Sequence, residues 1–187
     1  MKFTLSLLLL TVTLCSFLNA ADIPEDGIFV LNEKTFNKVL ANRQFVLMLF
    51  ENSTANETDP LIKEYSQAAL KLQTICPQLK LWKMNGTISQ ERQKRYNISS
   101  FPAIRLFKDN GYTPKDYDGG NTSQAIIDWF VTEMENNSTH LHIKDIEQAQ
   151  ELVKNKTHVA FYFGSHNSSG YLNFLSGLIA LNDPKIT

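Results

Sequence analysis

Cysteine is nearly absent from this chain, whose 187 residues include only Cys15 and Cys76. Cys15 lies in the segment Met1–Ala20, which has Lys2 near its start and the apolar run Leu7–Leu10, and which ends on a small residue. This pattern is typical of a secretory signal peptide, so we expect residues 1–20 to be removed. The mature chain then holds one thiol. The sequence therefore excludes an internal disulfide and any reaction that needs two thiols.

Long apolar runs and an excess of positive charge are also missing. Beyond the signal peptide no run reaches the roughly 20 residues that a membrane-spanning helix needs, so we expect no membrane span. The chain carries 18 Lys and Arg against 19 Asp and Glu. Its basic run, SQERQKRY at residues 89–96, is interleaved with polar residues, which is typical of a solvated helix face. Nucleic acid is therefore not an expected partner.

Residues that could hold a metal or serve as a new nucleophile do not form a set. Two of the four histidines, His140 and His142, alternate along an expected strand, and the other two lie apart. Thr54 and Thr58 have no nearby His or Lys to act as a base. We predict neither a metal site nor another cofactor.

What the chain does have is an alternation of apolar strands and amphipathic helices. Strands are expected at Ile28–Leu31, Phe45–Phe50, Leu79–Met84, Ala103–Lys108 and Asp116–Asp118. Helices are expected after the first strand, from Asp59-Pro60 to the stop at Pro77, over Ser89–Tyr96 and over Thr122–Met134. The order βαβαβαββα predicts an α/β fold.

The stretch FVLMLFENSTANETDPLIKEYSQAA, residues 45–69, resembles the reactive segment of a protein disulfide isomerase. In that family an apolar strand runs into a Cys-x-x-Cys pair at the start of an amphipathic helix. The element order, with Phe101-Pro102 before the fourth strand, resembles a thioredoxin domain of the same type across residues 27 to 135. The resemblance thus implies a thioredoxin-like fold.

The positions that match the cysteine pair of this family are Ala55 and Thr58. Neither supplies sulfur, so the scaffold is expected without thiol exchange and the chain is not expected to be an oxidoreductase. Two helper groups that the resemblance implies are also replaced. Leu49 stands where the family has a buried Glu, and Asn121 stands where it has an Arg. Together these replacements predict a site that no longer carries out redox chemistry.

Pro102 is retained. The resemblance implies that this proline is cis and that the backbone of Phe101 pairs with an extended client peptide. Phe101 and Pro102 would then form a peptide-binding edge. A purely architectural role of Pro102 stays open.

The pattern restarts after a polar linker at Glu135–His140. Strands are expected at Leu141–Ile143 and Val159–Phe163, and helices through Lys154 and over Gly170–Leu181. Residues 141–187 resemble the front of the redox-silent second domain of such isomerases. We therefore expect an incomplete second thioredoxin-like domain and a chain that is part of a longer one.

Asparagine sequons are strongly enriched. They occur at Asn52, Asn56, Asn85, Asn97, Asn121, Asn136, Asn137, Asn155 and Asn167. Composition alone gives about two, so the excess predicts real N-glycosylation. Asn97 is expected to lie close to the sheet. Glycans on Asn52 and Asn56 would obstruct a peptide groove and offer sugars to a lectin partner.

Three functional hypotheses follow. The first is a redox-inactive, chaperone-like protein of the endoplasmic reticulum lumen that binds unfolded client polypeptides or partners during protein folding. The second is the N-terminal part of a longer isomerase whose catalytic cysteines lie beyond Thr187. The third is a secreted structural glycoprotein. In all three, Cys76 is expected to be buried and inert, with an intermolecular disulfide as the alternative.

Overall fold

A five-stranded mixed sheet forms the centre of the molecule. The computed structural model describes residues 24–52, 59–85, 90–108, 111, 113–136, 143–154, 159–165 and 168–181. The strands are β1 (Ile28–Leu31), β2 (Phe45–Glu51), β3 (Leu81–Asn85), β4 (Ala103–Lys108) and β5 (Thr113–Asp116). Their order is β1-β3-β2-β4-β5. The first three in that order are parallel, and β4 and β5 are antiparallel to their neighbours.

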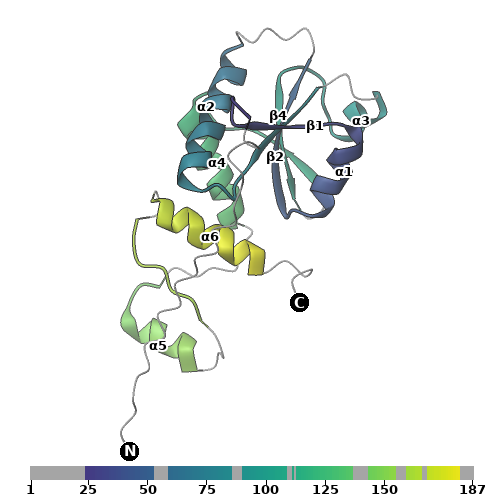
Figure 1. The fold of residues 1–187 in the computed structure, drawn as a ribbon. Helices are drawn as coiled ribbons and strands as arrows, with labels where there is room; N and C mark the ends of the chain where they lie inside the picture. The colour runs from purple at the N-terminus through teal and green to yellow at the C-terminus, as the bar shows by residue number, and fades with distance from the viewer. Residues whose placement is uncertain are drawn as a thin grey trace, which may run out of the picture.

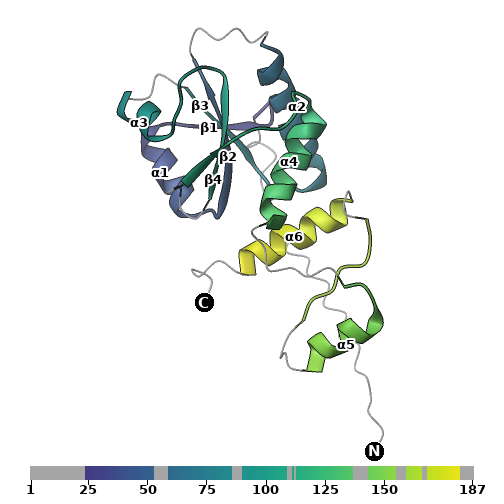
Figure 2. The ribbon, with the colours of Figure 1, turned by 180° about the vertical axis from the view of Figure 1, so that it is seen from behind.

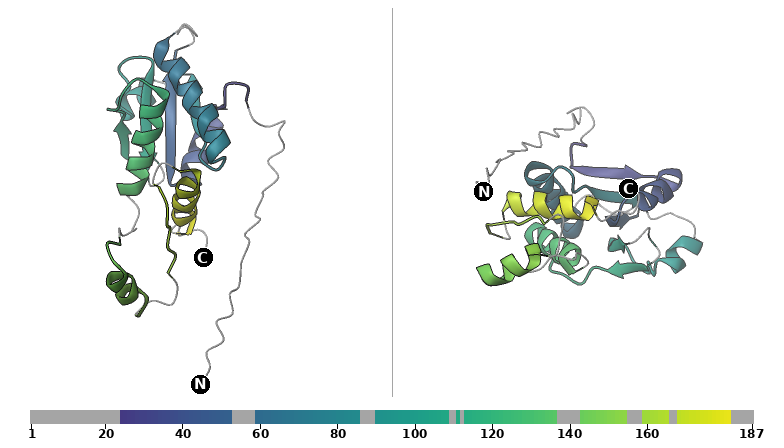
Figure 3. Two further views of the ribbon diagram at one scale, coloured as in Figure 1. Left: turned by 90° about the vertical axis from the view of Figure 1, so that its left-hand side faces the viewer. Right: turned by 90° about the horizontal axis from the view of Figure 1, so that it is seen from below.

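Helices cover both faces of the sheet. On one face lie α1 (Glu33–Ala41) and α3 (Gln90–Arg95), and on the other lie α2 (Pro60–Ile75) and α4 (Ser123–Asn136) (Figures 1 and 2). The left view of Figure 3 faces the side of the sheet that α2 and α4 cover, and these two helices lie in front of the strands there. The element order expected from the sequence, βαβαβαββα, is confirmed by the structure.

Strand β2 is buried because both of its faces carry apolar side chains. Val46, Met48 and Phe50 belong to the core cluster under α1 and α3. Leu47 and Leu49 belong to the cluster under α2 and α4. A continuous apolar run is what a central strand needs when helices cover both sides.

Local sequence signals set the helix starts. Asn32 caps α1, and its side-chain oxygen accepts from the backbone N–H groups of Lys34 and Thr35, both at 3.0 Å. Asp59 caps α2 in the same way, accepting from Leu61 N at 2.8 Å, and Pro60 occupies the first turn. A proline fits there because the first-turn N–H groups have no partner within the helix.

The last strand of the sheet lies earlier than expected. We predicted Asp116–Asp118, whereas β5 is Thr113–Asp116 and pairs Pro114 with Phe107 of β4. Pro114 concealed the strand in the sequence, since proline argues against a central strand. An edge strand tolerates it, because the position of the missing N–H faces outward.

The two C-terminal helices are α5 (Ile146–Lys154) and α6 (Ser169–Leu181). Helix α5 has no buried residue. Helix α6 lies beside the C-terminal end of α4 (Figures 1 and 2). Tyr171, Leu172 and Leu175 of α6 join the core cluster under α2 and α4. Side chains of α6, which follows α5 in the chain, thus complete the core under α2 and α4.

The strand expected at Val159–Phe163 is not formed among the described residues. Tyr162 packs instead on the rings of Tyr171 and Phe174, and Phe163 is 89% exposed. The strand expected at 141–143 falls mostly outside the described residues, and Ile143 is not in a strand. An apolar run of this length does not form a strand without a neighbouring strand to pair with. The incomplete second domain stays a prediction.

Candidate functional site

The end of β2 and the Phe101-Pro102 peptide lie side by side. In the ladder between β2 and β4 the last pair is Phe50 with Ala103. Pro102 comes directly before that pair, and the Phe101-Pro102 peptide bond is cis. Phe101 is half-buried and packs on the core cluster under α1 and α3. The backbone of Phe101 therefore lies just beyond the end of the ladder, next to the point where β2 leaves the sheet.

The residues that match the dithiol positions, Ala55 and Thr58, lie outside the described residues, as does Asn56. The two ends of their segment are described. Asn52 follows β2 and is half-buried, and Asp59 caps α2. The segment 53–58 thus connects the C-terminal end of a central strand to a capped helix start.

Leu49, which we expect at the position of the family's buried acid, is fully buried. It lies in the apolar cluster between the sheet and helices α2 and α4. A carboxylate in such surroundings raises the free energy of the folded state unless it is paired. Leucine avoids this penalty and leaves no proton-transfer group at the position.

Tyr65 fixes α2 against the sheet beneath the site. Its hydroxyl lies 2.9 Å from the carbonyl oxygen of Leu47 and 3.0 Å from that of Trp82. The side chain is fully buried, and burial raises the pKa of this phenol. Tyr65 therefore acts here as a neutral hydrogen-bond donor that joins one helix to two strands.

Lys83 is a site residue that the sequence interpretation missed. It lies on β3 directly opposite Leu49 of β2. Its Nζ is 2.8 Å from a carboxylate oxygen of Asp26 and 3.8 Å from one of Glu51. A lysine in a strand between buried residues was the available signal, because lysine is rarely buried without a partner.

Asn121 is exposed, immediately before α4. Two residues later Ser123 is buried against α2. The backbone N–H of Ser123 donates to Glu64 Oε2 at 2.6 Å, and Lys71 Nζ donates to its Oγ at 2.9 Å. These contacts anchor the first residue of α4 on α2, and Asn121 lies two residues before it.

The described sequon asparagines differ in exposure. Asn97 lies close to the sheet, as expected, since its carbonyl oxygen accepts from Arg105 of β4 at 2.8 Å. Its side chain is exposed, and its φ is 53° at the end of α3. Asn136 is exposed at the end of α4, and Asn85 is the last residue of β3. The remaining sequon asparagines, Asn137, Asn155 and Asn167, lie outside the described residues together with Asn56.

Cys76 lies far from this site. It follows the last residue of α2 and is fully buried. Its thiol contacts Gln78 Oε1 at 3.4 Å and Ser176 Oγ of α6 at 3.8 Å. Burial raises the pKa of the thiol and outweighs these hydrogen bonds. Because α2 has 16 residues, Cys76 lies about 24 Å from the capped start of that helix.

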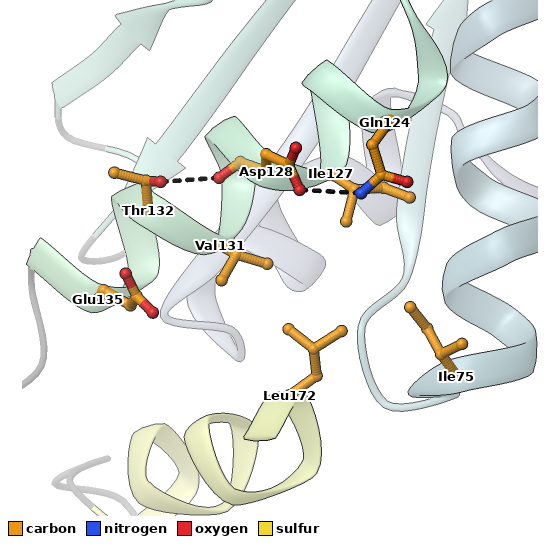
Figure 4. A pocket seen from close by; sticks show the side chains of 8 residues that line it. All are labelled: Ile75, Gln124, Ile127, Asp128, Val131, Thr132, Glu135 and Leu172. Atoms are coloured by element: carbon orange, nitrogen blue, oxygen red, sulfur yellow. Dashed lines mark hydrogen bonds between the residues drawn. The ribbon is translucent and has the colours of Figure 1, made fainter. Parts of the chain in front are cut away.

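A cleft of about 200 Å³ lies at the same distant end, between α4, α6 and the end of α2 (Figure 4). It is lined by Ile75, Gln124, Ile127, Asp128, Val131, Thr132, Glu135 and Leu172. Gln124 Nε2 donates to Asp128 at 2.9 Å, and Thr132 donates to the Asp128 carbonyl at 2.8 Å. These polar groups are engaged along α4, so the cleft does not display a reactive set.

Within 24–52, 59–85 and the later described segments, no three His, Cys, Asp or Glu side chains gather as a metal would need. Across the same part of the chain, no helix combines the length and apolar character required to cross a bilayer.

Comparison with known proteins identifies the family. The thioredoxin family profile matches residues 27–132. The probable protein disulfide-isomerase A4 of Caenorhabditis elegans is 30% identical over 113 residues, which are 60% of this chain and 17% of that protein. Protein disulfide-isomerase A2 of Mus musculus is 29% identical over 130 residues, which are 69% of this chain and 24% of that protein. The chain thus spans about a quarter or less of the length of these relatives.

Solved structures agree on the fold. The first thioredoxin domain of mouse protein disulfide-isomerase A4 superposes with a TM-score of 0.53 at 23% identity, covering 66% of this chain and 90% of that domain. Human ERp44 in form II gives a TM-score of 0.52 at 20% identity, covering 83% of this chain and 43% of that one. The chain therefore belongs to the thioredoxin family, and the relatives that its sequence matches within that family are protein disulfide isomerases.

Proposed function

We propose that this chain is a redox-inactive member of the protein disulfide isomerase group that binds extended segments of unfolded polypeptides in the lumen of the endoplasmic reticulum. The observation that carries the proposal is the position of the single mature thiol. Cys76 is fully buried at the far end of α2, and the positions that match the dithiol are Ala55 and Thr58. Thiol exchange needs an accessible thiolate, which this arrangement does not supply.

Peptide binding is supported by the geometry at Phe101. The ladder between β2 and β4 ends at Ala103, so the backbone groups of Phe101, just beyond that end, can pair with an extended client segment by hydrogen bonds. The half-buried ring of Phe101 adds apolar contact beside that edge. Backbone pairing depends little on client sequence, which suits a protein that handles many unfolded chains.

Location in the endoplasmic reticulum is supported by two features of the sequence. Residues 1–20 have the pattern of a signal peptide, and the chain carries nine sequons. Glycans on the mature protein also make recognition by a lectin partner part of the proposal. The chain would then act beside disulfide-forming relatives without exchanging disulfides itself.

Two assays on the mature chain test the proposal. In the first, glutathione reduces insulin in the presence of the chain, and we expect no acceleration over the uncatalysed rate. In the second, fluorescence anisotropy measures binding of a labelled, permanently unfolded polypeptide such as carboxymethylated lactalbumin. We expect Phe101→Ala to weaken that binding by about tenfold, because an aromatic anchor at an interface contributes on this scale.

Phe163→Ala is the matched control, since Phe163 is 89% exposed on a different part of the chain. Its binding should equal that of the unchanged chain. Clear insulin turnover would show that the chain is not redox-inactive. Equal losses in both phenylalanine variants would show that exposed rings, and not the Phe101 edge, hold the polypeptide. Repeating the binding assay after N-glycan removal shows whether glycans obstruct the edge.

A further inference from the structure

Asn121 and the hydroxyl that completes its sequon have opposite environments in the folded chain. The sequon is Asn121-Thr122-Ser123. The side chain of Asn121 is exposed, whereas Ser123 is 4% exposed. The asparagine alone does not define a sequon, because the hydroxyl two residues later is also recognised when an oligosaccharide is transferred. The hydroxyl residue of this sequon is therefore buried, while its asparagine is exposed.

The backbone N–H and the hydroxyl of Ser123 are both hydrogen-bonded to charged side chains of α2. Its backbone N–H donates to Glu64 Oε2 at 2.6 Å, and its Oγ accepts from Lys71 Nζ at 2.9 Å. Bonds to charged groups are the stronger kind. Thr122 is engaged as well, since its Oγ1 accepts from Ala125 N at 3.2 Å. An enzyme that must pair with the Ser123 hydroxyl has to displace Lys71 and separate α4 from α2.

We propose that Asn121 is an N-glycosylation site that is open only before α4 packs on α2, so that its modification is timed by folding. In the transfer, Nδ2 of Asn121 bonds to the anomeric carbon of an oligosaccharide. The bond from that carbon to the diphosphate of a lipid carrier breaks, and one proton leaves Nδ2 for a base of the transferring enzyme. The co-reactant is thus a lipid-diphosphate-linked oligosaccharide.

The finished glycan is compatible with the fold. Asn121 precedes the first residue of α4 and points to solvent. A sugar on its side chain leaves Ser123 free to return to Glu64 and Lys71. Packing of α4 on α2 therefore blocks transfer of the oligosaccharide to Asn121. The folded chain can still carry a glycan that was added earlier, so an early modification persists.

Asn97 provides an internal reference. Its sequon is Asn97-Ile98-Ser99, and both Asn97 and Ser99 are exposed. Within the described residues its backbone hydrogen bonds go to Lys94 of α3 and Arg105 of β4, and not to α2 or α4. Weakening the packing of α4 on α2 should therefore change the ratio of transfer at Asn121 to transfer at Asn97.

The test uses the mature chain produced without glycans, a transferring enzyme of the endoplasmic reticulum and a lipid-linked donor, with occupancy of each site read by mass spectrometry. We expect transfer at Asn121 to be at least about tenfold slower in the folded chain than in a peptide spanning residues 117–127, because the folded chain must open locally first. Equal rates would overturn the proposal.

A double variant, Glu64→Gln with Lys71→Met, distinguishes two explanations of slow transfer at Asn121. Either the packing of α4 on α2 blocks the site, or the transferring enzyme recognises this sequon poorly in any state. If circular dichroism shows that it stays folded, the ratio of Asn121 to Asn97 occupancy should rise severalfold. An unchanged ratio in the folded variant contradicts the proposal. If the variant unfolds, occupancy at Asn121 should reach the peptide rate, and failure to do so contradicts it equally. These outcomes do not depend on client binding, so they are independent of the proposed function.

Discussion

Leu49 and Lys83 lie opposite each other on neighbouring parallel strands, and only Lys83 carries a charge. In a parallel pair, residues in register point to the same face of the sheet. A carboxylate introduced at Leu49 would therefore lie beside a lysine. In the native chain that lysine bonds to Asp26 instead, at 2.8 Å.

The first prediction concerns restored catalysis. Ala55→Cys with Thr58→Cys should give weak reduction of insulin, because no side chain at position 49 can move a proton. Adding Leu49→Glu should raise the rate at least about tenfold, since a positioned acid or base contributes on this scale or more. The rate is measured as glutathione-dependent insulin reduction.

Leu47→Glu is the matched control for that experiment. Leu47 is equally buried in the same cluster, two residues farther from the loop. It should give no gain over the two-cysteine chain. An equal gain from both glutamates would mean that position 49 has no special part in proton transfer.

The second prediction concerns Glu133, which is 8% exposed on α4 and lies 2.7 Å from both Lys108 and Lys115. Burial opposes its ionisation, but the hydrogen bonds and charges of the two lysines outweigh burial and lower its pKa. A carboxyl whose pKa is lower in the folded state stabilises the fold above its unfolded pKa of about 4.3. This stabilisation is lost as the pH falls through the lower folded-state pKa.

Glu133→Gln should therefore lower the free energy of unfolding at pH 7 by about 1–3 kcal/mol and flatten its dependence on pH below 4.3. Urea denaturation at pH 7 and at pH 3 measures both effects. The control is Glu151→Gln, whose ion pair with Lys154 is more than two-thirds exposed on both sides. It should change stability by less than about 0.5 kcal/mol. A decrease of similar size in the two variants would contradict the role of burial.

The third prediction concerns Tyr65. Removing its hydroxyl in Tyr65→Phe leaves the carbonyl groups of Leu47 and Trp82 without this donor, so we expect a loss of about 1–2 kcal/mol. Tyr96→Phe is the comparison, because Tyr96 is also buried and its ring packs edge-on against Phe107, with the ring centroids 5.0 Å apart. The free energy of unfolding from urea denaturation should be clearly lower for Tyr65→Phe than for Tyr96→Phe. The reverse order would show that the Tyr65 hydroxyl does not anchor α2 to the sheet.

The fourth prediction concerns α6. Leu175 is 1% exposed within the core of the thioredoxin-like domain, so Leu175→Ala should lower the stability of that domain by about 2–4 kcal/mol. Fluorescence of Trp82 and Trp129 reports its unfolding, because both lie within residues 27–132. The same variant should speed the reaction of Cys76 with a thiol reagent. An unchanged unfolding midpoint would show that α6 is not part of this domain.

The sequence predicted most of the sheet because burial there is encoded locally. The bounds of β1 and β4 are as expected, and β2 extends one residue further. The packing of α6 was not predictable in this way. Its apolar face is visible in the sequence, but we assigned that face to a second domain. In the structure it packs on α4, where apolar surface was available.

For the candidate site, the sequence predicted which family residues are replaced, but it did not predict the long-range contacts that Lys83 and Ser123 make. We singled out Leu49 and Asn121 because the resemblance implies other residues at these positions, and that assignment stays a prediction. In the structure Leu49 is buried and Asn121 is exposed. The Lys83 pair with Asp26 joins residues 57 positions apart, and the contacts of Ser123 with α2 are equally long-range. Such contacts have no local periodicity from which they can be predicted.

Strand β5 has a consequence for self-association. A protein that works among unfolded chains is exposed to their free strands, and an open sheet edge invites them to add on and aggregate. At this edge Pro114 cannot donate a hydrogen bond to an incoming strand. The β5 edge of the sheet is therefore a poorer template for an incoming strand than an edge on which every outward position carries an N–H group.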